Sequence, residues 1–73
     1  MEHIIVFRSR TQVINFKRML EGYGVHSEIV STPRRLSIGC GLSLKINSRD
    51  FYKAKDLIDA YKPQGFVGIY DWQ

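Results

Sequence analysis

The chain has 73 residues and a formal net charge of +4, and 44% of its residues are hydrophobic. This length predicts one domain, residues 1–73, with a thin core. The longest apolar run, Ile4 to Phe7, is too short to span a bilayer, and we expect no signal peptide and no membrane association. A single cysteine, Cys40, excludes an intramolecular disulfide and a multi-thiolate zinc site. It also favours a reducing, cytoplasmic location.

The first part of the chain predicts a strand, a helix and a second strand. His3–Arg8 is rich in β-branched and aromatic residues, which are typical of a strand. Ser9 and Gln12 have the spacing of a capping box, and a helix is predicted over Thr11–Tyr23. Its apolar residues recur on one helical face. They are Val13, Phe16, Leu20 and Tyr23. A second strand is predicted over Val25–Val30.

The second part repeats this order, with a strand before a helix and a strand after it. Leu42–Ile46 alternates apolar and polar residues, which predicts a strand with one buried face. Either Asn47 or Ser48 caps a helix that continues to about Tyr61. The last strand is predicted over Phe66–Tyr70.

The two predicted helices carry matching apolar faces. The second face follows the first at a distance of 38 residues and consists of Phe51, Ala54, Ile58 and Tyr61. Two strand–helix–strand units of this kind are typical of an α+β, ferredoxin-like βαββαβ sandwich. We therefore expect a four-stranded antiparallel sheet with both helices on one face. Four aromatic residues are predicted in the core, namely Phe16, Tyr23, Phe51 and Tyr61. Trp72 is expected to pack against a sheet edge.

A long loop, Ser31–Gly41, separates the second and third strands and holds Cys40 between Gly39 and Gly41. In a βαββαβ fold this loop lies at the same end as the start of the first helix. The turn after the second helix lies there too. Five cations should therefore gather near the thiol, namely Arg8, Arg10, Arg34, Arg35 and Lys62. These charges and the positive helix end favour the nucleophilic thiolate over the thiol.

The residues alone leave two roles open for Cys40. Free cysteine is often a small packing residue, and Cys40 could simply begin the third strand. A reactive thiol is the other role, because flanking glycines allow a partner to approach the sulfur closely. For at least one of Arg34 and Arg35, a solvated loop position is the better expectation.

The loop sequence resembles that of the selenium/sulfur (Se/S) carrier-like family, long described as a bacterial domain of unknown function. The resemblance lies in Thr32-Pro33-Arg34, a stretch of small residues, and Cys40-Gly41 before a hydrophobic strand. The opening residues 4–7 also match the family's first strand. The resemblance implies that Cys40 carries sulfur or selenium as a persulfide or selenopersulfide, with Arg34 as its support.

The predicted site consists of Cys40 as the carrier thiol and four residues that bind the substrate. These four are Arg34, Arg35, Gly39 and Gly41. A carrier of this kind needs no metal and no cofactor of its own. It does need a donor protein, such as a PLP-dependent enzyme that mobilises sulfur or selenium. Exposed edge strands are compatible with a homodimer.

Other functions fit the sequence less well. A cysteine hydrolase needs a positioned base, but His3 and His26 are expected at the far end from Cys40. An RNA-binding module shares the βαββαβ order, but Leu42–Ile46 lacks the aromatic residues on which bases stack. A small binding or regulatory module remains the alternative, and an inert, buried Cys40 would be its signature. The sequence thus favours a non-enzymatic carrier over an enzyme.

Overall fold

Four strands and two helices form in the predicted order in the computed structural model, which describes residues 1–72. The strands are β1 (Glu2–Phe7), β2 (Glu28–Ser31), β3 (Leu42–Asn47) and β4 (Phe66–Asp71). The helices are α1 (Arg10–Gly22) and α2 (Phe51–Tyr61), and a 3₁₀ turn, η1 (Ser48–Asp50), precedes α2. None of the helices in residues 1–72 has the length and apolar character needed to cross a membrane.

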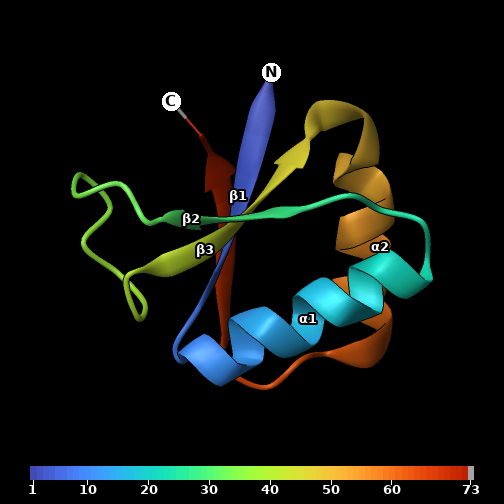
Figure 1. Cartoon of the computed structure of the whole chain (residues 1–73), viewed down its shortest axis with the longest axis horizontal. Helices are drawn as coiled ribbons and strands as arrows, with labels where there is room; N and C mark the ends of the chain where they lie inside the picture. The colour runs from blue at the N-terminus through green and yellow to red at the C-terminus, as the bar shows by residue number, and fades with distance from the viewer. Residues whose placement is uncertain (73) are drawn as a thin grey trace.

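The strands pair in the order β2-β3-β1-β4, and each neighbouring pair is antiparallel. In the centre of the sheet, Ile5 of β1 lies opposite Leu44 of β3 on one side and Ile69 of β4 on the other. Figure 1 shows both helices beside this sheet, with the loop between β2 and β3 projecting on the side away from α2. The α+β, ferredoxin-like βαββαβ fold is therefore confirmed.

One face of the sheet packs against both helices and forms the main core. Because side chains alternate along a strand, Ile5 and Phe7 of β1 point to the same face, and both are fully buried. Both helices pack on this face. Their buried residues are Val13, Phe16 and Leu20 of α1 and Ala54, Leu57 and Ile58 of α2. Both helices thus cover one face, as predicted.

The second strand begins three residues later than predicted, at Glu28 instead of Val25. The reason is the end of α1. The backbone N–H of Val25 donates to the carbonyl of Leu20 at 2.8 Å, and Gly24 donates to Glu21 at 3.0 Å. These bonds satisfy helix carbonyls that would otherwise lack a partner. The segment before Glu28 therefore terminates the helix and does not pair in the sheet.

The start of α1 confirms half of the predicted capping box. The Ser9 hydroxyl accepts a hydrogen bond from the Gln12 backbone N–H at 3.3 Å. The reciprocal bond does not form, because the buried Oε1 of Gln12 has no partner among residues 1–72. Asn47 caps η1, since its side chain accepts from the N–H of Arg49, whereas the N-cap residue of α2 is Asp50. The alternative cap, Ser48, is the first residue of η1.

Of the four aromatic residues predicted in the core, Phe16 belongs to it and the other three lie outside it. Tyr23 and Tyr61 are 42% and 53% exposed, whereas Phe16 is buried and Phe51 is half-buried against the ring of His3. Tyr23 caps α1 and Tyr61 is the last residue of α2, so both lie beyond the last buried turn. Their hydroxyl groups are hydrogen-bonded to each other and join the ends of the two helices.

We expect Tyr23 to lose its proton at a higher pH than an isolated tyrosine. The hydrogen bond to Tyr61 raises the pKa of Tyr23 above its ordinary value of 10.0. A raised pKa stabilises the folded state below pH 10, and this contribution disappears as the pH rises through the raised value. Replacing Tyr61 with phenylalanine should bring the pKa of Tyr23 back down. A carbon-13 NMR titration of Tyr23 measures this, and equal midpoints in the two proteins would contradict it.

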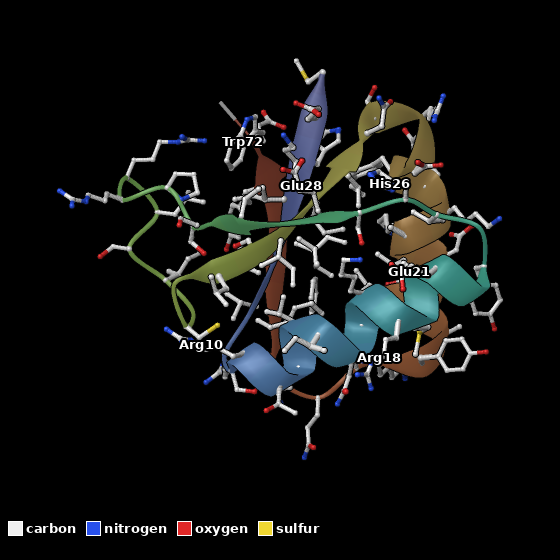
Figure 2. All side chains as sticks on the ribbon, in the orientation of Figure 1. Arg10, Arg18, Glu21, His26, Glu28 and Trp72 are labelled. Carbon is white, nitrogen blue, oxygen red and sulfur yellow. The ribbon has the colours of Figure 1, made fainter. Side chains whose placement is uncertain are left out.

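The other face of the sheet is also covered. Ile4, Val6 and Ser43 point away from the main core, yet each is fully buried. Trp72 lies over this face, because its N–H donates to the carbonyl of Glu2 and its ring lies 5.2 Å from Nζ of Lys45. Figure 2 shows Trp72 close to β1. Trp72 directly follows β4, and its ring faces the ammonium group of Lys45 from β3. The sheet edges are β2 and β4.

Candidate functional site

The loop between β2 and β3 is held closed at its base. The backbone N–H of Thr32 donates to the carbonyl of Gly41 at 2.9 Å, and the hydroxyls of Thr32 and Ser43 are 2.6 Å apart. Within the loop, the N–H of Leu36 donates to the carbonyl of Pro33, which defines a tight turn. These bonds give the segment between Thr32 and Gly41 a defined shape at the end of the sheet.

Cys40 lies in a turn before β3 and is fastened to the end of β1. Its backbone N–H donates to the carbonyl of Phe7 at 3.2 Å. Gly39 (φ 74°) and Gly41 (φ 90°) both adopt backbone conformations that other residues rarely adopt. At Gly39, a Cβ atom would lie only 2.6 Å from the Phe7 oxygen and from Cγ1 of Val6. The two glycines thus allow the loop to press against β1 and hold Cys40 there.

The thiol of Cys40 is half-buried and packs against the main core. Its Sγ lies 3.7 Å from the carbonyl oxygen of Leu42, to which the thiol can donate a weak hydrogen bond. The thiol is therefore neither fully buried, as a packing residue would be, nor fully exposed, as a freely reactive thiol would be. Side-chain rotation would break this weak bond and would move the sulfur away from Leu42 and from its packing against the core.

Two connections place the predicted cations at the Cys40 end of the sheet. Cys40 is bonded to Phe7, and the N–H of the next residue, Arg8, donates to the carbonyl of Gly65 in the turn after α2. Figure 2 shows Arg10 in the first turn of α1, at this end of the molecule. Arg8 and Lys62 line a cavity of about 570 Å³ there.

These cations have no acidic partners in the part of the chain that the structure describes. The six ion pairs formed among residues 1–72 leave out Arg8, Arg10, Arg34 and Lys62. Several of the pairs lie at the opposite end, where Lys45 contacts both Glu2 and Glu28. The Cys40 end is therefore available to an anion.

The two loop arginines differ in their contacts. Arg34 lines a cavity of about 520 Å³ together with Gly39 and Gly41. Arg35 does not line this cavity, and its Nη2 donates to the backbone carbonyl of Asp71 in β4 at 2.8 Å. Arg35 therefore ties the loop to the far edge strand. Its predicted role as a substrate ligand would depend on the N–H groups that this bond does not use.

The histidines lie away from the thiol. His3 is at the beginning of β1, where Nδ1 lies 3.4 Å from Oδ1 of Asp71, whereas Cys40 is bonded to the last residue of β1. His26 lines a separate cavity with Glu28 and Asn47. Within residues 1–72, no group of three or more His, Cys, Asp or Glu side chains could hold a metal ion.

Two structural contributors to the site were not identified from the sequence. The first is the Phe7 carbonyl, which no residue pattern could indicate because any residue has a carbonyl. The second is the hydroxyl pair of Thr32 and Ser43, which are on either side of the loop. A polar residue at the buried position 43 was the available signal, since buried hydroxyls need a partner.

Comparison with known proteins identifies the family of this chain. No match was found among curated proteins or among solved structures. The family model described as "Putative Se/S carrier protein-like" matches residues 2–70, which include every strand and helix up to the last strand. Because the match spans nearly all of the sequence, the chain belongs to this Se/S carrier-like family.

Proposed function

We propose that this protein carries sulfur or selenium on Cys40 as a persulfide or selenopersulfide and transfers it between partner proteins. The observation that supports this most directly is the setting of the single thiol. Cys40 lies between two glycines of positive φ, at an end of the sheet where several cations lack acidic partners. Membership of the Se/S carrier-like family supports the same function.

The chemistry requires one sulfur atom from the carrier. The Cys40 thiolate attacks the outer sulfur of a donor persulfide, R–S–SH. The donor's S–S bond breaks, its electron pair leaves with the R–S⁻ thiolate, and the outer sulfur remains on Cys40 as Cys40–S–SH. Selenium transfer from R–S–SeH follows the same balance. Nearby cations favour each step because the attacking and leaving groups are anions.

The donor in this proposal is a second protein, such as a PLP-dependent enzyme that releases sulfur or selenium from an amino acid. In this proposal the carrier needs no cofactor of its own, because the donor supplies the mobilised atom to it. A reducing compartment suits the carrier, because there Cys40 remains a thiol until it is loaded.

Replacing Cys40 with serine should abolish loading and leave the fold intact. A hydroxyl can still donate to the Leu42 carbonyl, but it is a poor nucleophile at neutral pH. We expect a stability loss of about 1 kcal/mol or less, since the side chain is small and only half-buried. Intact-mass spectrometry after incubation with a persulfide or selenopersulfide donor should show a gain of one sulfur or selenium atom in the natural protein only.

Iodoacetamide alkylation of the natural protein is the control for accessibility of the thiol. If the thiol is alkylated but takes up neither atom from any donor, the carrier function is wrong. A non-covalent binding or regulatory role would then be the better explanation. Unfolding of the Cys40→Ser variant would instead point to a packing role, consistent with the contact between Cys40 and the core.

A further inference from the structure

The cavity formed by the β2–β3 loop has a lining suited to an anion. It is lined by Thr32, Pro33, Arg34, Ser37, Ile38, Gly39 and Gly41. Its lining combines a cation with no carboxylate, whereas the cavity that contains Lys45 and Arg49 is also lined by Glu2, Glu28 and Asp50. The Arg8–Lys62 cavity, in contrast, also contains the carboxylate of Asp59. An anion therefore meets no acidic side chain in the lining of the loop cavity.

The loop also has hydrogen-bond donors to spare. Among residues 1–72, the backbone N–H groups of Ser37, Ile38, Gly39 and Gly41 have no acceptor. All four residues line the cavity. Ser37 (φ 51°), Gly39 and Gly41 have positive φ, and alternation of such residues with ordinary ones is how backbone N–H groups form anion-binding concavities. Arg34 adds a guanidinium, whose paired N–H groups can donate to two oxygens of one oxyanion.

We propose that this cavity binds the oxyanion group of an inorganic sulfane-sulfur donor of the thiosulfate class, with Arg34 as its charged ligand. This inference rests on the proposed carrier function and adds a route of loading that needs no donor protein. Cys40 lies between two residues of the cavity lining, Gly39 and Gly41. Cys40 itself is not part of the lining, and its thiol must turn away from the core and from the Leu42 carbonyl to reach the bound donor.

The transfer step balances without an added oxidant or reductant. The Cys40 thiol first releases its proton to solvent. The thiolate then attacks the outer sulfur of S–SO₃²⁻, and a new S–S bond forms on Cys40. The donor's S–S bond breaks and its electron pair leaves with SO₃²⁻. The products are Cys40–S–S⁻ and sulfite, and the total charge is unchanged.

Arg34→Gln is the decisive variant, because it removes the charge and keeps a polar side chain on an exposed loop. We expect the rate of Cys40 persulfidation by thiosulfate, followed by intact mass, to fall about tenfold. Reaction of Cys40 with dimethyl trisulfide, a neutral sulfane-sulfur reagent that leaves a methyl disulfide or trisulfide adduct and releases the matching thiolate, should not change. Arg49→Gln is the matched control, because it removes the same charge from an exposed residue that lies just after β3, at the end of that strand away from Cys40. Its thiosulfate rate should equal that of the natural protein.

Sulfate provides a second test that involves no sulfur transfer. Sulfate has the oxyanion but no transferable sulfur, so it should shift the NMR amide signals of Ser37, Gly39 and Gly41. These shifts should be lost in Arg34→Gln. If Arg34→Gln slows both donors equally, or sulfate shifts none of these signals, the oxyanion site is wrong and the carrier function stands. If neither donor loads a thiol that iodoacetamide alkylates, both proposals are wrong.

Discussion

Replacing Gly39 with alanine is expected to destabilise the protein by about 2–4 kcal/mol. The added Cβ would lie 2.6 Å from the backbone oxygen of Phe7 and from Cγ1 of Val6, and neither atom belongs to a flexible side-chain end. The positive φ of 74° adds backbone strain to this overlap. A domain of this size has only about 3–5 kcal/mol from its core, so much of the protein should be unfolded. Urea denaturation followed by circular dichroism measures the loss.

Two other glycines separate the effect of the overlap from that of the backbone. Gly41 has φ 90° but open space around its Cα, so Gly41→Ala should cost about 1 kcal/mol from strain alone. Gly22, in the last turn of α1, has neither restriction, and Gly22→Ala should be neutral or stabilising. Equal losses at positions 39 and 41 would show that the loop does not press on β1.

Gly39 should also affect the position of the thiol, because it allows the loop that holds Cys40 to pack against β1. If Gly39→Ala lets the loop leave β1, the N–H of Cys40 loses the Phe7 carbonyl and the sulfur leaves the core. Cys40 should then be alkylated faster by iodoacetamide, whereas specific loading by a sulfur donor should be slower. The rate of alkylation reports how exposed the thiol is, and the rate of sulfur loading reports whether it is correctly placed for transfer. The Gly39→Ala variant should change these two rates in opposite directions.

The fold could be predicted from the sequence because its signals are periodic. Strand alternation in residues 42–46 and the two matched helical faces determine which side chains share the core. The beginning of β2 could not be predicted, because Val25 fits a strand by composition but its N–H is used to end α1. Tyr23 and Tyr61 fit the helical spacing as well, but spacing does not reveal that the sheet beneath a helix has ended.

The end of the sheet at which the candidate site lies could be predicted from the order of the strands and helices. The chain order alone places the loop, the start of α1 and the turn after α2 at one end of the sheet, and the bonds from Cys40 to Phe7 and from Arg8 to Gly65 agree. The direction of individual loop side chains was not predictable. Arg34 and Arg35 are neighbours in sequence, yet one lines the loop cavity and the other reaches β4. That difference depends on the turn at Pro33–Leu36, and no periodic pattern indicates it.

Replacing Phe7 with alanine should have the largest effect on stability, about 3–5 kcal/mol. Phe7 is fully buried, and its ring packs 5.3 Å from that of Phe16 and 6.0 Å from that of Phe66. Removal of the ring leaves a cavity in a thin core, which has few neighbouring side chains that could move into it. The expected loss approaches the stability of the whole domain, so Phe7→Ala should show no cooperative urea transition at 25 °C.

Phe66→Ala is the matched control, because Phe66 loses the same ring from a half-buried position at the start of β4. It should lose about half as much, since the cost follows the apolar surface that was buried. Phe7→Leu retains most of the volume and should remain folded with a smaller loss, about 1–2 kcal/mol. Since the Phe7 carbonyl still accepts from Cys40 in Phe7→Leu, sulfur loading should persist there. If the Phe7→Ala protein is folded and nearly as stable as the natural protein, the Phe7 ring does not contribute to the core as proposed.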